Sequence, residues 1–433
     1  MPSAKDSKIL FFSYYYPPIQ SPGVKRNYTI SHLFLESFKN ITVFTTSNRK
    51  VMAQEVQSIS PYLSLVEIPT FDYRYLSYLI LKNKESAESK VKGNKGGKYF
   101  LKAMRSFPIN IFIGEGGLWY ILSAYAKAKK LLLQDPNTII YSSFSPYSDH
   151  VVALLLKRKF PEIFWIADFR DLHVDPTYRN YLWKNLQLWF NKRVISKATF
   201  VTTVSEGLAQ NLKQFHDDIY VLPNGVSNIP EPIERYHDKF TISYTGAMFQ
   251  DKRKPQLFLK AIQELIAEGD LKENKIRIQQ AGRDVAIWEL IINEFELDDV
   301  FESKGVVALE EAHLLQAKSH LNLLLTTSHK EYKGVLTSKI FEYLAAGNPI
   351  VVIVNGPKDE IYEEAMSGIE SVFIGYDSDD LMAIKKFILH HYQIWLTGGE
   401  YPRIEKESWD ERYYWPKMIN GLQEKIQMNI DDV

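Results

Sequence analysis

The residues best placed to do chemistry lie in Lys333–Pro349, KGVLTSKIFEYLAAGNP. Thr337 or Ser338 can cap a helix that starts here, and the backbone N–H groups at a helix N-terminus favour a phosphate. Lys339 adds positive charge in the first turn. Glu342 follows one turn later, and its carboxylate could accept hydrogen bonds from the two hydroxyls of a ribose. The alternative is an ordinary capped amphipathic helix, but a glutamate inside the apolar run FEYLAAG favours a binding site.

A second candidate is the segment 243–254, SYTGAMFQDKRK. A predicted strand ends at Gly246, and three cations follow it: Lys252, Arg253 and Lys254. Clustered cations beside a glycine loop suit a diphosphate. A solvated basic turn is the alternative interpretation.

Charged residues also end another predicted strand, in WIADFRD. Asp168, Arg170 and Asp171 follow an apolar run, where three charges are costly unless they are paired or used. Asp168 or Asp171 could orient or deprotonate an acceptor hydroxyl. Alternatively, Arg170 pairs with one of the two aspartates and the cluster is structural.

Two further strand-to-helix turns carry candidate residues. His150 ends the segment SSFSPYSDH; a lone histidine is usually structural, but this position predicts a substrate contact in a cleft. In PPIQSPGVKRNY, Gly23 permits close backbone approach, and Lys25 and Arg26 lie in the first helical turn, where an anion is favoured. An ordinary turn is the alternative there, and G-x-G-x-x-G, the dinucleotide fingerprint, does not occur.

Composition narrows the class of protein. Lys+Arg and Asp+Glu are 52 each in 433 residues, which argues against a protein built mainly to hold nucleic acid. Because there is no cysteine, disulfides and thiolate metal sites are excluded. The N-terminal residues lack the apolar core of a signal peptide, and no window of about 18 apolar residues predicts a membrane-spanning helix. We therefore expect a cytoplasmic protein.

The elements that must position these residues alternate between strand and helix. Strands are predicted at 8–13, 41–45, 63–68, 138–142, 163–167, 200–204, 220–222, 240–244, 275–279, around Val306, 321–325 and 350–354. Helices are predicted at 23–38, 119–133, 150–159, 256–268, 310–318 and 338–345. This order predicts an α/β fold of two Rossmann-like, doubly wound domains that face each other across a cleft, with ligands beyond the carboxyl ends of the strands.

The expected domain boundaries follow from the same pattern. Residues 1–225 form the first domain, and 226–238, VSNIPEPIERYHD, a proline-containing linker. Residues 239–407 form the second domain, and 408–433 a C-terminal helix that packs back on the first. Residues 82–99 read as a mobile surface loop. The basic, aromatic stretch from Tyr73 to Trp119 is either such a loop with a core helix or a peripheral contact with a membrane.

The chain resembles the GT-B-fold glycosyltransferases, and in particular the retaining group called family 4 (glycosyl transferases group 1). The resemblance covers nearly the whole length, and SKIFEYLAAGNPIV is its most specific part. The other parts, in order, are FFSYYYPPIQSPGVKR, ADFRDL, VTTVSEGL, LPNGV, YTGAMF and QQAGRD.

The resemblance implies that the second domain binds a nucleoside-diphosphate sugar. Glu342 matches the acidic residue that binds the ribose, and Arg253 and Lys339 fall near the positions that hold the diphosphate. The remaining donor-binding positions are Gly23, Gly246, Gly282, Thr337 and Ser338. His150, Asp168 and Asp171 are the candidate catalytic residues, and Lys25, Arg26 and Arg170 are assigned to a glycan or lipid-linked acceptor.

The resemblance also implies a hexosyltransferase of polysaccharide synthesis that retains anomeric configuration. A D-x-D metal motif does not stand out, so we expect neither a metal nor another cofactor beyond the nucleotide-sugar, and no nucleic acid partner. Family members often carry a first glutamate eight positions before the second, where this chain has Gly334. That departure leaves room for a degenerate partner subunit; an epimerase or a phosphorylase is a further alternative.

Overall fold

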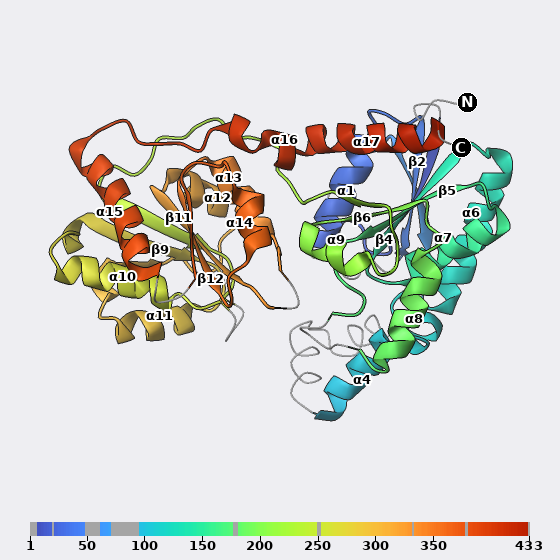
Figure 1. The fold of residues 1–433 in the computed structure, drawn as a ribbon, viewed down its shortest axis with the longest axis horizontal. Helices are drawn as coiled ribbons and strands as arrows, with labels where there is room; N and C mark the ends of the chain where they lie inside the picture. Colours follow the sequence, from blue (N-terminus) through green and yellow to red (C-terminus); the bar gives the residue numbers. More distant parts are fainter. Residues whose placement is uncertain are drawn as a thin grey trace. The chain divides into compact units, whose positions relative to one another are not determined.

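The structure, a computed structural model, describes residues 7–19, 21–47, 61–70, 95–175, 181–248, 253–330, 333–376 and 380–431 (Figure 1). The chain divides into two compact units. Unit 1 comprises Met1–Pro223 together with Met418–Val433, and unit 2 comprises Asn224–Lys417. Unit 2 is thus inserted into the sequence of unit 1 just before its last helix.

Unit 1 is built on a seven-stranded parallel sheet with the order β3-β2-β1-β4-β5-β6-β7. Its apolar strands are buried along nearly their whole length, as expected of parallel strands covered on both faces. The strands are β1 (Lys8–Phe12), β2 (Asn40–Thr46), β3 (Leu63–Ile68), β4 (Thr138–Phe144), β5 (Phe164–Phe169), β6 (Phe200–Thr203) and β7 (Ile219–Val221).

Helices connect and cover these strands. They are α1 (Pro22–Phe34), α4 (Lys95–Arg105), α5 (Ile109–Phe112), α6 (Leu118–Gln134), α7 (Ser148–Lys159), α8 (Lys184–Ile195), α9 (Glu206–Leu212) and α17 (Trp415–Asp431). The Ser21 side chain caps α1 by accepting from Val24 N–H. From Met418 onward α17 belongs to unit 1: Leu422 and Ile426 are buried, and Lys425 pairs with Asp218 at 2.9 Å.

Unit 2 repeats the same plan with six parallel strands, in the order β10-β9-β8-β11-β12-β13. They are β8 (Phe240–Thr245), β9 (Ile276–Ala281), β10 (Phe301–Ser303), β11 (Leu321–Thr327), β12 (Ile350–Asn355) and β13 (Val372–Gly375). The helices are α10 (Gln256–Ala267), α11 (Val285–Glu294), α12 (Leu309–Lys318), α13 (Ser338–Ala346), α14 (Glu360–Met366), α15 (Leu381–Thr397) and α16 (Asp410–Tyr413).

Alternate residues of β11 and β12 enter two different cores, one on each face of the unit 2 sheet. Leu323 and Ile353 pack with α10, α11 and α15. Leu324 and Val352 pack with α13, α14 and α16. Since side chains alternate between the faces of a strand, the continuous apolar runs LNLLL and IVVIV are what a sheet covered on both faces requires.

Both sheets reverse strand order once, between β1 and β4 in unit 1 and between β8 and β11 in unit 2. Ligands of doubly wound sheets bind outside the carboxyl ends of the strands at this switch point. In unit 2 the carboxyl end of β8 leads into Gly246 and that of β9 into Gly282. The fold therefore assigns a candidate site to each unit separately.

The predicted α/β fold with two doubly wound sheets is confirmed. The strand predicted around Val306 is wrong: the strand is β10, and Val306 is 75% exposed in the loop after it. Helices α8, α11, α14 and α15 and strand β13 were not predicted. In the described part of the chain, no helix combines the length and the apolar character needed to cross a bilayer.

Candidate functional site

Two glycines meet at the carboxyl edge of the unit 2 sheet. A side chain at Gly282 would bring its Cβ to 2.1 Å from the Gly246 carbonyl oxygen. Both have φ near +145°, where other residues are strained. The Gly246 N–H donates to the Ala281 carbonyl at 2.8 Å. The two backbone segments can therefore approach closely because neither glycine has a side chain. The Lys339 side chain lies next to them, with its Cε 3.9 Å from the position of a Cβ on Gly246.

Glu342 lies on α13 and faces a small polar cluster. One of its carboxylate oxygens accepts from Lys339 Nζ at 2.5 Å and from Gln316 Nε2 at 3.2 Å. His313 Nε2 lies 3.9 Å from the same oxygen. The Glu342 side chain is 16% exposed and that of Lys339 25%, so the pair is sheltered but open to solvent. A ligand hydroxyl can compete for such a carboxylate.

Buried polar groups support this cluster from below. Gln316 Nε2 also donates to Thr245 Oγ1, at 2.8 Å. The Tyr343 hydroxyl accepts from Thr245 N–H at 3.1 Å and donates to the Leu323 carbonyl at 3.2 Å. Burial raises the pKa of Tyr343 far above its usual value, so the hydroxyl stays neutral. Gln316 and Tyr343 were not predicted as site residues, because neither belongs to a recognisable pattern.

The N-terminus of α13 is available to an anion. Thr337 occupies the N-cap position with extended backbone, yet its side chain makes no capping hydrogen bond. Its Oγ1 is buried and has no hydrogen-bond partner among the described residues. Ser338, the next residue, is exposed. The N–H groups at the start of α13, the exposed Ser338 hydroxyl and Lys339 together suit a phosphate.

Arg253 lies at the same edge. Its Nη1 donates to the Ala247 carbonyl at 3.3 Å, and Lys254 N–H donates to Asn355 Oδ1 at 2.6 Å. The structure therefore places Arg253 in the segment that follows β8 and Gly246, at the edge of the sheet that the Lys339 side chain of α13 also reaches. The third predicted cation, Lys252, lies outside the described residues.

Unit 1 has a charged pair at its own carboxyl edge, but this pair is sealed. Asp168 accepts from Arg26 Nη2 at 2.9 Å, from Thr202 Oγ1 at 2.8 Å and from Ser143 Oγ at 3.2 Å. Both charged side chains are at most 1% exposed. Burial alone would raise the pKa of Asp168, but Arg26 and the hydroxyl donors hold it below its usual value.

The structure does not bring Asp168 or Arg26 to the surface, and their predicted direct roles toward an acceptor stay predictions. What the structure shows is that the Asp168–Arg26 pair ties β5 to α1. The charge of Asp168, which is costly to bury alone, is neutralised by Arg26 inside unit 1.

His150 was expected to face a cleft, and the structure buries it completely. Its Nδ1 lies 2.8 Å from Ser142 Oγ, which also accepts from Trp165 Nε1 at 2.8 Å. Burial lowers the pKa of His150 to about 3, so the ring is neutral near pH 7. Its Nε2 has no partner among the described residues. His150 is thus placed to support the end of β4 rather than to contact a substrate directly.

Of the remaining predicted residues of unit 1, Gly23 is buried, and Lys25, Arg170 and Asp171 lie nearer the surface. A Cβ on Gly23 would fall 0.8 Å from Arg170 Nη1, so only glycine lets this guanidinium cross the start of α1. Arg170 Nε lies 3.8 Å from Asp171 Oδ2, and the Asp171 side chain is 68% exposed. Lys25 is also exposed. Asp171, Arg170 and Lys25 thus remain the acidic and basic candidates for an acceptor.

A buried carboxyl that the sequence did not single out lies beside His150. Asp149 accepts from Tyr14 N–H at 2.9 Å and from the Tyr120 hydroxyl at 2.6 Å. Burial raises the pKa of Asp149 to about 7. Among the described residues no cation is hydrogen-bonded to it, unlike Asp168. The group therefore links α7 to the end of β1 through neutral donors.

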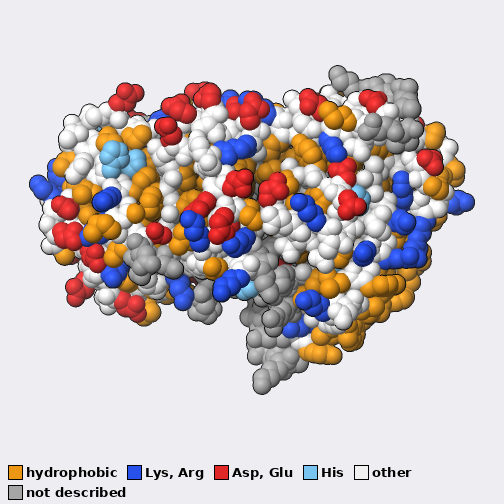
Figure 2. Space-filling model, in the orientation of Figure 1, with side chains coloured by type: hydrophobic (Ala, Val, Ile, Leu, Met, Phe, Trp, Pro, Cys, Tyr) orange, Lys and Arg blue, Asp and Glu red, His pale blue; other side chains and the backbone are white. Residues whose placement is uncertain are grey.

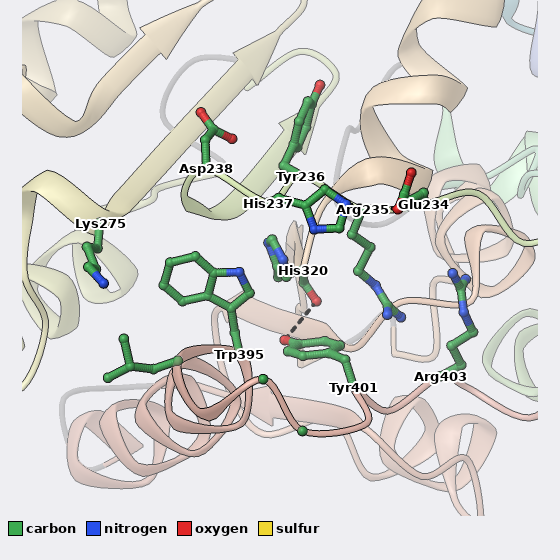
Figure 3. Close-up of a pocket in the computed structure, with 13 residues that line it drawn as sticks. Glu234, Arg235, Tyr236, His237, Asp238, Lys275, His320, Trp395, Tyr401 and Arg403 are labelled. Carbon is green, nitrogen blue, oxygen red and sulfur yellow. Dashed lines mark hydrogen bonds and ion pairs between the residues drawn. The ribbon is translucent and has the colours of Figure 1, made fainter.

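Unit 2 also has a pocket of about 630 Å³ at the opposite, amino-terminal edge of its sheet (Figure 3). Asp238, Lys275 and His320 lie within two residues of the starts of β8, β9 and β11, and they line the pocket with Trp395 and Tyr401. The Tyr401 hydroxyl donates to the His320 carbonyl at 3.1 Å. This pocket lies away from Glu342 and contains none of the predicted site residues. In the described part of the chain, no three His, Asp or Glu side chains gather as a metal site would require.

Solved structures show what this chain is similar to. The N-terminal domain of trehalose-6-phosphate phosphatase from Candida albicans superposes with a TM-score of 0.61 at 12% identity, covering 98% of this chain and 97% of that one. Sucrose-phosphate synthase from Thermosynechococcus elongatus gives 0.60 at 12%, covering 99% and 100%. The lipopolysaccharide outer core galactosyltransferase WaaB gives 0.52 at 12%, covering 98% of both chains. No family model and no curated protein matches the sequence. At these identities the likeness establishes the GT-B fold and nothing finer.

Proposed function

We propose that this chain is a glycosyltransferase that binds a nucleoside-diphosphate sugar at the carboxyl edge of unit 2. The observation that carries the proposal is the cluster on α13. Glu342 presents a sheltered carboxylate to a ribose, and Lys339 and the uncapped helix N-terminus lie one turn away, where a diphosphate would follow. A nucleoside diphosphate has ribose hydroxyls, which a carboxylate can bind, next to phosphates, which cations and helix N–H groups can bind.

The close backbone approach at Gly246 and Gly282 supports the same placement, because bulky groups there would fill the space next to Lys339. Arg253 extends the positive charge along this edge. Sucrose-phosphate synthase and the galactosyltransferase WaaB, whose names describe sugar transfer, share the fold. These likenesses support the class of reaction; the site residues carry the argument for this chain.

In the proposed reaction an acceptor oxygen attacks the anomeric carbon of the donor sugar. The bond from that carbon to the phosphate oxygen breaks, and the nucleoside diphosphate leaves with the bonding electrons. We propose retention of configuration, with the acceptor proton passing to the leaving phosphate. Lys339, Arg253 and the α13 N–H groups would stabilise the charge on this leaving group without a metal ion.

We further propose a hexosyl transfer to a glycan or lipid-linked acceptor of surface polysaccharide synthesis, in the cytoplasm. Asp171, Arg170 and Lys25 are the groups of unit 1 exposed enough to orient that acceptor. Asp168 and His150 would act through the position of β4 and β5, not by contact. This assignment extends the sequence prediction and depends on the donor site described above.

Thermal unfolding in the presence of UDP, GDP, ADP, TDP or CMP tests the donor site. We expect one diphosphate to raise the melting temperature, and the Glu342→Ala variant to lose that rise. Glu294→Ala, at an exposed position of α11, is the matched control and should keep it. If no nucleotide shifts the melting temperature, the proposed donor site is wrong.

A catalytically degenerate binding subunit is the second candidate, because Gly334 stands where relatives of the resembled family often have a glutamate. In the structure the Gly334 N–H donates to both carboxylate oxygens of Asp359, at 2.9 and 3.0 Å. To separate an active transferase from a degenerate subunit, the chain is incubated with the nucleotide-sugar that contains the nucleoside diphosphate found to bind. Nucleotide binding without donor hydrolysis or transfer to any offered glycan would favour the degenerate subunit.

A further inference from the structure

Unit 1 exposes an apolar and aromatic surface on α4, α5, α6 and α8, which we call the aromatic face. Among the described residues, six of the seven large aromatic side chains that are exposed belong to it. These are Tyr99, Phe100, Phe112, Trp119, Trp183 and Trp189. Apolar side chains gather over α4 and α8 in Figure 2, with lysines and arginines beside them. Single exposed apolar residues are ordinary, but a concentration on one set of helices indicates a binding surface.

The helices that carry the aromatic face are linked to one another near the turn between α4 and α5. The Gln187 side chain of α8 bonds both the N–H and the carbonyl of Phe107, at 2.8 and 2.9 Å. The Phe107 and Phe190 rings stack with their centroids 4.0 Å apart. Ser106 Oγ accepts from Leu182 N–H at 2.6 Å. The turn between α4 and α5 is therefore fixed to α8, and α6 follows α5 directly.

The charged aspartate, glutamate, lysine and arginine positions of these helices are all basic. Lysine and arginine number four in α4, three in α6 and three in α8, and no aspartate or glutamate occurs in any of the four helices. The whole chain, by contrast, has a net charge of zero. On α8, Lys192 and Arg193 follow the exposed Trp189 by three and four residues and so share its side of the helix. The aromatic face is complementary to an anionic surface.

Backbone strain at this face adds an independent observation. Trp183, the N-cap of α8, has φ of +53°, a conformation that bulky residues rarely adopt. Its side chain is nevertheless 52% exposed and so gains little from packing inside the unit. A strained bulky residue that points into solvent indicates a role outside the folded core.

We propose that the aromatic face docks on a lipid bilayer that contains anionic headgroups. Tryptophan and tyrosine prefer the boundary between headgroups and acyl chains, and lysine and arginine prefer anionic headgroups above it. A nucleic acid would match the charge but not the many exposed apolar side chains. The sequence pointed only to the stretch up to Trp119, and the structure adds α6 and α8. The proposal is independent of the reaction in unit 2.

Sedimentation of the full chain with vesicles tests this docking. We expect weak binding to phosphatidylcholine vesicles, much stronger binding when about a quarter of the lipid is phosphatidylglycerol, and a loss of that gain at about 0.5 M salt. Trp119→Gln with Trp189→Gln should weaken binding about tenfold or more on anionic vesicles. Leu290→Gln, at an exposed apolar position of unit 2, is the matched control.

Lys192→Gln with Arg193→Gln should weaken binding to anionic vesicles by about fivefold for each cation removed and leave binding to neutral vesicles unchanged. The matched control is Lys213→Gln with Lys272→Gln, two exposed lysines outside the aromatic face. All variants should keep the melting-temperature rise with nucleotide, which separates this proposal from the donor site. Equal binding by all variants overturns the proposal. The proposal is also overturned if the parent chain does not bind vesicles and is a dimer that the tryptophan substitutions convert to a monomer.

Discussion

The same sheet edge carries a charged pair in both units, and the two pairs are built for opposite purposes. In unit 1, Asp168 and Arg26 are sealed and their remaining hydrogen bonds are internal. In unit 2, Glu342 and Lys339 are partly open and lie beside an uncapped helix N-terminus. A sealed pair fixes the fold at a switch point, whereas an open pair can exchange its partners for a ligand. An acid–base pair at the carboxyl edge of a sheet therefore does not by itself imply a ligand-binding role.

The largest effect should come from breaking the sealed pair. Arg26→Ala leaves Asp168 buried without its cation, so we expect the free energy of unfolding to fall by about 3–5 kcal/mol. Urea denaturation followed by tryptophan fluorescence measures it. Lys25→Ala, at the preceding residue, should change the free energy of unfolding by less than about 0.5 kcal/mol. A small loss in Arg26→Ala would show that the pair is not sealed.

Asp149 tests what burial does to a carboxyl that has no cation bonded to it. Its pKa is about 7 in the folded chain and about 3.9 when unfolded, so the folded state binds the proton more tightly. The resulting stability is fully present below about pH 4 and is lost as pH rises through 7. Wild type should therefore lose about 2–4 kcal/mol relative to Asp149→Asn between these pH values.

The measurement is the difference between the two urea unfolding curves at each pH. Subtraction is needed because His150 and His173 act in the opposite direction. Burial lowers their pKa values to about 3 and about 4, so they contribute stability that is present above about pH 6.5 and is lost as pH falls through the lowered values. A flat difference from pH 4 to 7 would contradict the raised pKa of Asp149.

The open pair should affect binding more than stability. In Lys339→Ala we expect about 5–30-fold weaker binding of the nucleoside diphosphate that stabilises wild type, with the corresponding nucleoside bound equally well. The free energy of unfolding should change by less than about 1 kcal/mol, because the pair is partly exposed. Isothermal titration of both ligands gives the two affinities. An equal loss for diphosphate and nucleoside would place Lys339 away from the phosphates.

The smallest effect should come from the support beneath the open pair. Tyr343→Phe removes the hydroxyl that bonds Thr245 N–H and the Leu323 carbonyl. We expect a loss of about 1 kcal/mol in the free energy of unfolding, with nucleotide affinity changed less than about twofold. Urea unfolding and titration measure these. A larger loss of affinity than of stability would show that the support reaches the ligand directly.

Periodicity and strand-end motifs in the sequence predicted both sheets well. Apolar runs such as TIIYS and LNLLL are long enough and apolar enough to mark buried parallel strands. The pattern failed for β10, which has only three residues, none of them fully buried, while the apolar pair Val306 and Val307 lies in the loop after it. Helix α8 was missed because its buried side includes the polar Gln187 and Asn191 while the apolar Trp189 is exposed, which weakens the amphipathic contrast.

The grouping of Thr337, Ser338, Lys339 and Glu342 was predictable because these residues are close in sequence, at the start of one helix. The unit 1 cluster was not, because pairing depends on separation in space: 142 positions separate Arg26 from Asp168. Sequence reasoning could name both as charged strand-end residues, but only the structure shows that they neutralise each other. Asp149 gave no signal, since its donors come from Tyr14 and Tyr120 in other elements.

The insertion of unit 2 into unit 1 has a consequence for synthesis on the ribosome. The part of α17 that belongs to unit 1 contains the buried Leu422 and Ile426 and pairs Lys425 with Asp218. It begins at Met418 and is translated after all 194 residues of unit 2, from Asn224 to Lys417. Until then the nascent unit 1 lacks its last helix, while unit 2 already has all of its strands. Synthesis from the N-terminus should thus let unit 2 complete its fold while unit 1 still lacks the side chains of Leu422 and Ile426.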